Sequence, residues 1–122
     1  MRTFRSMVAI VLAGLAGSAG ATERLDRARR MAASGDARGA KTMLADAARQ
    51  GDRESLREYA EFLDRFGDPG AREAYGRLLD ATQDGDAKRA LLRRLATLDL
   101  IAGDRAAAEP RLRSLGVSRA SS

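Results

Sequence analysis

The chain contains no cysteine, histidine or tryptophan. The absence of cysteine excludes disulfides and thiolate metal sites. The absence of histidine removes the commonest general base and one of the usual zinc ligands. Catalysis would have to rest on Asp, Glu, Lys or Tyr, and no glycine-rich phosphate-binding loop accompanies them. We therefore predict a protein that is not an enzyme, with no catalytic, cofactor-binding or metal-binding residues.

The chain also lacks a long apolar run. The longest one, from Val8 to Ala16, follows Arg2 and Arg5 and precedes the small residues 19–21. This order is typical of a secretory signal peptide, and the run is far shorter than the roughly 20 residues that span a bilayer. We expect residues 1–21 to be a cleaved leader and the remaining chain to be periplasmic or secreted, with no stable membrane span. Retention of the leader as an anchor stays open.

Charge of one sign is only slightly in excess. The whole chain carries +5, and residues 22–122 carry 20 basic against 17 acidic side chains, a net charge of +3. Arginines alternate with acidic residues instead of forming a block, which argues against nucleic acid as a partner. The excess favours an acidic protein, an anionic polysaccharide or a lipid headgroup surface.

What the chain does contain is a repeated interval of 34 residues. Apolar residues recur at helical spacing over six segments, with no alternating strand pattern, which predicts an all-α fold of antiparallel helical hairpins. The segments lie at about 22–33, 36–50, 52–66, 69–82, 86–102 and 104–115. An Ala-x-x-x-Leu pair stands at the same place in every second segment: Ala40/Leu44, Ala74/Leu78 and Ala108/Leu112. A period of this length indicates stacked helix-turn-helix units.

Glycine and aspartate mark the predicted turns. Gly35-Asp36, Gly51-Asp52, Gly85-Asp86 and Gly103-Asp104 each combine a helix-ending glycine with a capping carboxylate. In the middle unit, Asp68 is expected to cap a helix with Pro69 as its first residue. Pro110 is expected in the first turn of the last helix, where its missing N–H costs little.

Several burial patterns follow from the helical period. In the third segment Leu56, Tyr59, Ala60, Leu63 and Phe66 form the expected buried face. The fifth segment is so apolar that we expect it to be buried on two sides. Glu58, Glu61 and Asp64 are expected on a solvated face, balanced by Arg57 and Arg65. The glycines at positions 39 and 76 suggest close helix packing.

With these residues in place, the chain resembles the tetratricopeptide repeats. Ala28 and Ala96 stand 12 residues before Ala40 and Ala108, where that family places a small residue. The resemblance implies three repeats stacked as an α-solenoid over residues 22–116, in units of about 22–51, 52–85 and 86–116. Residues 117–122 are expected to be a flexible tail. The middle unit has Phe62 at the small-residue position, which suggests a slipped first helix. The stretches 47–52 and 81–86 resemble the related Sel1-like type instead.

The resemblance also implies where a partner binds. In similar repeats the first helices line a concave groove, which here would present Arg29, Tyr59, Arg93 and Thr97; Tyr59 as an ordinary core residue is the alternative. Leu112 and Leu115 are predicted at an exposed end, facing a partner or a second copy of the chain.

We therefore expect a non-enzymatic exported scaffold that binds a protein or peptide of the cell envelope. The alternative is an accessory subunit that holds an anionic polysaccharide or cell-wall polymer in a basic groove.

Overall fold

A computed structural model describes residues 22–50 and 52–116. The predicted leader (1–21), Gly51 and the predicted tail (117–122) lie outside the described residues. The described part of the chain forms six helices and contains no strand, so the prediction of an all-α fold is confirmed. The chain divides into two compact units, with the boundary between Ser55 and Leu56.

The first unit contains a helix over residues 22–33 and α2 (Ala37–Arg49). Gly35 joins them with a φ of 97°, a conformation that glycine adopts without strain. The Asp36 side chain then caps α2 by accepting a hydrogen bond from the Gly39 amide at 2.9 Å. The core of this unit consists of Leu25, Ala28, Ala40, Leu44, Ala47 and Ala48.

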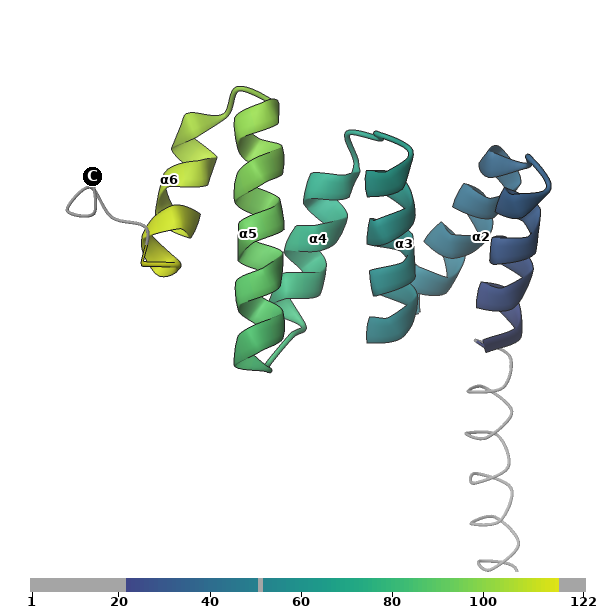
Figure 1. Cartoon of the computed structure of the whole chain (residues 1–122). Helices are drawn as coiled ribbons and strands as arrows, with labels where there is room; N and C mark the ends of the chain where they lie inside the picture. Colours follow the sequence, from purple (N-terminus) through teal and green to yellow (C-terminus); the bar gives the residue numbers. More distant parts are fainter. Residues whose placement is uncertain (1–21, 51, 117–122) are drawn as a thin grey trace, which may run out of the picture. The chain divides into compact units, whose positions relative to one another are not determined.

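The second unit contains most of α3 (Arg53–Arg65), followed by α4 (Ala71–Asp80), α5 (Gly85–Ile101) and α6 (Arg105–Ser114). These helices run in alternating directions, and α5 packs against both α4 and α6 (Figure 1). The buried apolar residues of this unit are Leu56, Ala60, Phe62, Leu63, Ala71, Ala74, Tyr75, Leu78, Leu95, Ala96 and Ala108.

The interval of 34 residues has a structural counterpart in the second helix of each hairpin. Ala40, Ala74 and Ala108 are the fourth residues of α2, α4 and α6, and all three are buried. Each alanine occupies a position where a larger side chain would meet the partner helix. The Ala pairs counted in the sequence therefore mark equivalent places in three helices.

The first helices of the hairpins end in the same way but not at the same interval. Gly35, Gly67 and Gly103 all have positive φ. At each one, the amide of the following aspartate bonds a carbonyl five residues back at 2.8 Å, the pattern of a Schellman motif. A buried alanine stands seven residues before each glycine, at positions 28, 60 and 96. The middle first helix is therefore slipped by two residues, as the sequence suggested.

The predicted start of α4 was wrong. We expected Pro69 to be its first residue, but α4 begins at Ala71. Asp68 accepts a hydrogen bond from the Gly70 amide at 2.8 Å, and its carbonyl accepts one from the Ala71 amide at 3.1 Å. These bonds close a turn around Pro69 and Gly70, with proline at the turn position that its fixed φ favours. The two extra residues restore the interval at Ala74.

The start of α5 also differs from the prediction. The cap is Asp84, whose side chain accepts a hydrogen bond from the Ala87 amide at 2.9 Å, and Gly85 is the first helical residue. Asp84 has an extended backbone, which a capping residue requires, whereas Asp86 already lies inside the first turn.

Pro110 lies deeper in α6 than predicted. Because α6 begins at Arg105, Pro110 is its sixth residue and stands in the second turn. The carbonyl of Ala106, four residues before it, therefore has no helical amide partner at position 110.

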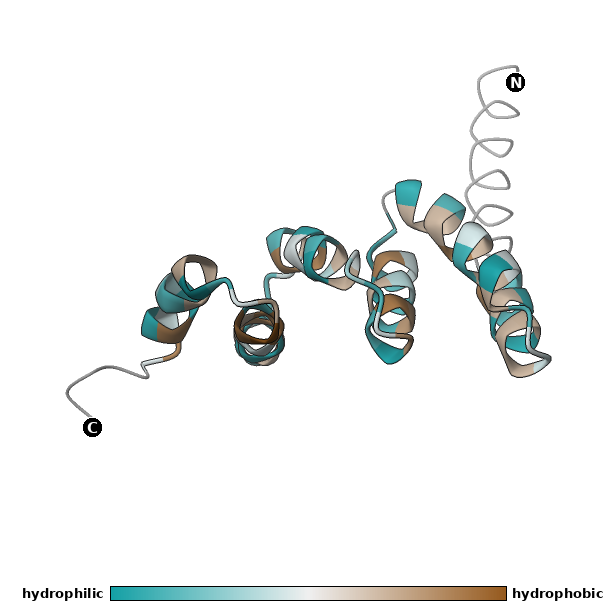
Figure 2. Ribbon diagram, turned by 90° about the horizontal axis from the view of Figure 1, so that it is seen from above, coloured by the Kyte–Doolittle hydropathy of each residue, from teal (hydrophilic) through white to brown (hydrophobic). Residues whose placement is uncertain are grey.

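Two predictions about apolar burial were also wrong. Phe66 was expected in the core, but it follows the last residue of α3 and is 52% exposed, while Phe62 is only 5% exposed. The end of α5 was expected to be buried, but Leu100 and Ile101 are exposed. In Figure 2 this end of α5 is coloured as strongly hydrophobic. The buried residue there is Asp99.

Candidate functional site on the second unit

A hollow of about 420 Å³ lies between α5 and α6. We call it the α5–α6 hollow; its lining residues are Arg89, Arg93, Ala96, Thr97, Leu100, Leu112 and Leu115. It brings together four residues that the sequence singled out separately: Arg93 and Thr97 from the predicted groove, and Leu112 and Leu115 from the predicted exposed end.

Helical geometry explains how these residues meet. On α5, positions 89, 93, 96 and 100 are three or four residues apart, so their side chains form one stripe along the helix. On α6, Leu112 and Leu115 are three residues apart and both are partly exposed. The turn at Gly103 folds α6 back against α5, which places the two leucines beside this stripe.

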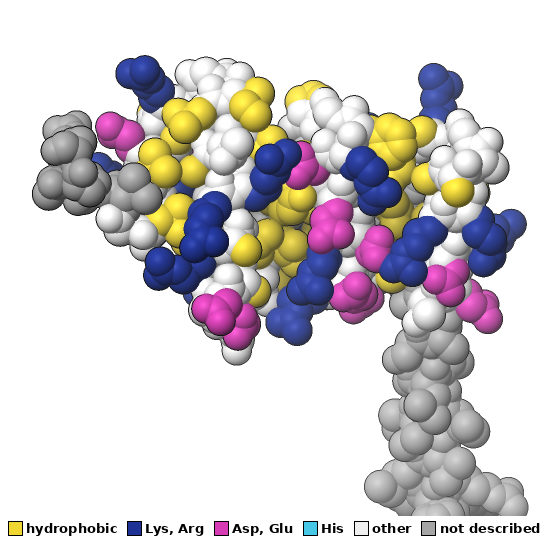
Figure 3. Space-filling view, in the orientation of Figure 1, with side chains coloured by type: hydrophobic (Ala, Val, Ile, Leu, Met, Phe, Trp, Pro, Cys, Tyr) yellow, Lys and Arg dark blue, Asp and Glu magenta, His cyan; other side chains and the backbone are white. Residues whose placement is uncertain are grey.

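The hollow is apolar inside and positively charged at its edge. Figure 3 shows hydrophobic side chains flanked by Lys and Arg side chains over α5 and α6. The lining contains no acidic residue. Arg89 and Arg93 are exposed, and within residues 22–50 and 52–116 neither guanidinium forms an ion pair. The Thr97 hydroxyl donates to the Arg93 carbonyl at 2.9 Å, within the helix itself.

The other two predicted groove residues lie elsewhere. Tyr59 is half-buried on α3 and does not line the α5–α6 hollow. Arg29 belongs to the first unit, where it is exposed and donates to the Asp26 carboxylate at 3.1 Å. The structure thus places only Arg93 and Thr97 of the predicted groove in one site.

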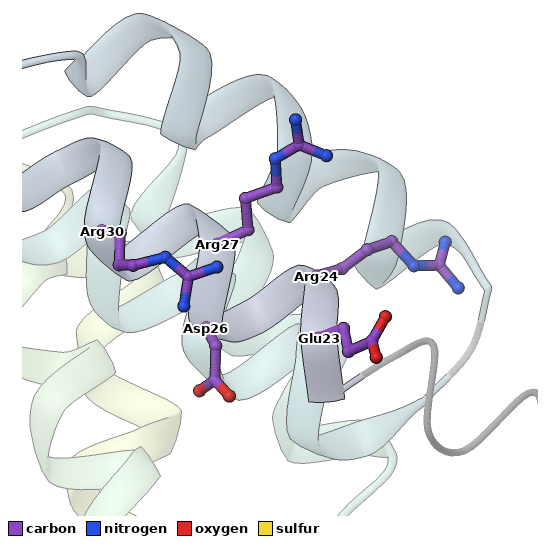
Figure 4. Close-up of a pocket in the computed structure, with 5 residues that line it drawn as sticks. All are labelled: Glu23, Arg24, Asp26, Arg27 and Arg30. Carbon is purple, nitrogen blue, oxygen red and sulfur yellow. The ribbon is translucent and has the colours of Figure 1, made fainter.

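The helix over residues 22–33 presents a second charged surface, within the first unit. Figure 4 shows five side chains that project from this helix around a shallow hollow of about 460 Å³: Glu23, Arg24, Asp26, Arg27 and Arg30. Arg24 donates to the side-chain oxygen of Gln50 at 3.2 Å. Arginines outnumber acids here by three to two, so this surface is mixed but mainly basic.

Sequence reasoning missed a buried carboxylate. The side chain of Asp99 on α5 has no exposed surface, and it accepts hydrogen bonds from Arg72 on α4 and Arg111 on α6. Arg72 also donates to Asp104 at 2.8 Å, which lowers the pKa of Asp104. A charged residue inside the apolar run Leu98 to Ile101 was the available signal, because such a residue is buried only when it is paired.

A second ionic cluster joins α3, α4 and α5. The Asp64 carboxylate accepts hydrogen bonds from Arg94 at 2.7 and 2.6 Å and from the Tyr75 hydroxyl at 2.9 Å. The Arg94 guanidinium, more than any other group, holds the pKa of Asp64 below its usual range. Burial, and then the nearby Asp64, raise the pKa of the Tyr75 hydroxyl. The predicted pairing of Asp64 with Arg57 or Arg65 was wrong, because the partner comes from another helix.

A further hollow of about 410 Å³ lies between these two ionic clusters. We call it the Ile101 hollow; Asp64, Arg72, Arg94, Leu98 and Ile101 are among its lining residues. Both of its arginines are engaged with carboxylates, unlike those of the α5–α6 hollow. The unpaired positive charge therefore distinguishes the α5–α6 hollow.

The described residues provide little for chemistry. Among residues 22–50 and 52–116, no group of three or more His, Cys, Asp or Glu side chains could hold a metal ion. None of the described helices is both long and apolar enough to cross a membrane. The Asp64 and Asp99 carboxylates are held by arginines, so neither is placed to act as a base.

Comparison with known proteins finds no matching family model, no matching curated protein and no matching solved structure. The resemblance to tetratricopeptide and Sel1-like repeats therefore rests on the sequence features and stays a prediction.

Proposed function

We propose that this chain is a non-enzymatic scaffold, exported by its leader, that binds another protein of the cell envelope through the α5–α6 hollow. The tetratricopeptide-like arrangement of hairpins is part of this proposal. The observation that carries it is the exposed apolar floor of the hollow, formed by Leu100, Leu112 and Leu115.

An apolar floor with a charged edge is the usual anatomy of a binding surface. Apolar side chains in the centre of an interface provide most of the affinity, while polar groups around them remain partly solvated. In the α5–α6 hollow the leucines hold the central position and Arg89 and Arg93 lie at the edge. This arrangement suits a protein segment better than a small metabolite, because the surface is open and no buried polar group converges on it.

Substitution of the two α6 leucines tests the proposal. Full-length chain with Leu112→Glu and Leu115→Glu should lose partner capture from an envelope extract, because two carboxylates would occupy the apolar floor. The matched control is Phe66→Glu with Ile101→Glu, two exposed apolar residues outside the hollow. Circular dichroism checks that both variants remain helical. Capture that survives the first pair of substitutions would contradict the proposal.

A second function is favoured by the arginines of the helix over residues 22–33. Arg24, Arg27 and Arg30 project from one helix and would suit an anionic polysaccharide or cell-wall polymer, for which the chain would be an accessory subunit. Binding of this kind should disappear at high salt and in the Arg27→Ala, Arg30→Ala variant. Binding insensitive to salt would exclude it.

A further inference from the structure

Charge is distributed unevenly along the chain. Residues 22–51 contain seven basic and four acidic side chains, a net charge of +3. Residues 52–84 contain five basic and nine acidic side chains, a net charge of −4. Residues 85–116 return to seven basic and four acidic, again +3. The α5–α6 hollow therefore belongs to a basic segment, and its lining adds no acid of its own.

Within this basic segment, the arginines divide into two groups. Arg94 and Arg111 are ion-paired to Asp64 and Asp99. Arg89 and Arg93 have no such partner in the described part of the chain, and both line the hollow. The hollow thus combines an apolar floor with two cations that are available to a ligand.

These cations narrow the choice of occupant. A symmetric dimer through the hollow would bring Arg89 and Arg93 close to their own copies, and like charges at an interface are repulsive. The sequence of residues 117–122 contains Arg119 and no acidic side chain, so its side chains do not complement the hollow either. An acidic segment of a different protein has the complementary charge.

The spacing of the lining residues specifies the shape of that segment. Arg89 and Arg93 are one helical turn apart, and Leu100 lies about 16 Å along α5 from Arg89 at 1.5 Å per residue. A partner helix of about three turns would cover this stripe while its apolar face contacts the leucines of α6.

We propose that the α5–α6 hollow binds an acidic amphipathic helix of another protein, with two carboxylates four residues apart facing Arg89 and Arg93. Apolar side chains on the same face of that helix contact Leu100, Leu112 and Leu115. The inference rests on the proposed function and adds the chemical class of the partner. The arginines select and orient the helix, and the leucines hold it.

Synthetic peptides test this inference on the full-length chain. The probe is a fluorescent helical peptide of about 14 residues, with two Glu four residues apart followed by Leu at helical spacing. A second peptide has Gln at both Glu positions. Fluorescence anisotropy should show that the Glu peptide binds about tenfold more tightly than the Gln peptide, and that this advantage shrinks as salt rises.

Two matched variants locate the effect. Arg89→Ala with Arg93→Ala should weaken the Glu peptide about tenfold and leave the Gln peptide unchanged. Arg53→Ala with Arg77→Ala removes the same charge outside the hollow and should leave the Glu peptide binding intact. All four arginines are exposed, so both variants should fold.

Three results would overturn the inference. The two peptides could bind equally, the control variant could lose as much affinity as the Arg89 and Arg93 variant, or sedimentation could show a dimer that dissociates on Leu112→Glu and so occupies the hollow itself. Capture of an envelope partner that depends on Leu112 and Leu115 but not on the arginines would leave the proposed function standing and remove only the acidic helix.

Discussion

Arg72 on α4 and Asp99 on α5 form an ion pair of 2.9 Å in which the carboxylate is completely buried. Arg111 from α6 donates to the second oxygen of the same carboxylate. One acidic side chain thus ties three consecutive helices of the second unit, and these include both helices that line the α5–α6 hollow.

Loss of this carboxylate should destabilise the second unit. In Asp99→Ala, Arg72 and Arg111 keep their charge but lose their buried partner, and the free energy of unfolding should fall by about 3 kcal/mol. The control is Asp80→Ala, an exposed acid at the end of α4, with an expected change below about 0.5 kcal/mol. Urea unfolding followed by circular dichroism measures both. Equal effects would show that the Asp99 pairs contribute nothing.

Acid should weaken the cluster at Asp64. The pKa of Asp64 is lower in the folded chain than its ordinary value near 3.8, chiefly because of Arg94. A lowered pKa stabilises the fold above the ordinary value, and the stability is lost as pH falls through the lower, folded value. Asp64→Asn should therefore reduce the stability at neutral pH and flatten its decline below about pH 4. Unfolding curves at a series of pH values test this; parallel curves for both proteins would contradict it.

Two helical glycines should respond differently to alanine. Gly76 has open space around it, so Gly76→Ala should raise the free energy of unfolding by about 1 kcal/mol through helix propensity. A Cβ at Gly39 would lie 2.4 Å from Oδ2 of Asp36 and 2.5 Å from the Met31 methyl group. Gly39→Ala must displace the capping carboxylate of α2, which offsets that gain by about 1 kcal/mol. Thermal unfolding of the two variants should separate them; the same gain in both would refute the crowding at Gly39.

Removal of the internal proline should stabilise α6. Pro110→Ala restores an amide that can bond the Ala106 carbonyl, and a proline inside a helix costs about 3 kcal/mol relative to alanine. The gain should appear as slower hydrogen exchange in α6 and a higher midpoint of thermal unfolding. An unchanged exchange rate would mean that α6 already accommodates the proline without cost.

Local chemistry explains which features could be predicted from the sequence. A helix-ending glycine followed by a capping aspartate acts within a few residues, so the turns at Gly35 and Gly103 were predictable. The buried alanines at positions 40, 74 and 108 followed from a repeated interval. The pairs Asp64 with Arg94 and Arg72 with Asp99 join residues 30 and 27 positions apart. Periodicity does not specify which of many arginines reaches a given carboxylate, because that choice depends on how the helices pack.

The candidate site was predictable only in pieces. Arg93 and Thr97 were singled out by the repeat resemblance, and Leu112 and Leu115 by their place at the end of the last helix. The packing of α6 against α5 joins these pairs and adds Arg89 and Leu100 to them. Arg29 lies in a different unit, which a repeat pattern applied uniformly to the chain could not reveal.

The turn at Pro69 and Gly70 acts like a second frameshift that suppresses a first. α3 ends two residues early and the turn adds two back, so Ala74 keeps its distance from Ala40 while the glycine turns do not keep theirs. Selection on such a chain would act on the sum of the two length changes. Deleting Pro69 and Gly70 alone should displace Ala74 from its buried position, whereas inserting two residues into α3 at the same time should restore it.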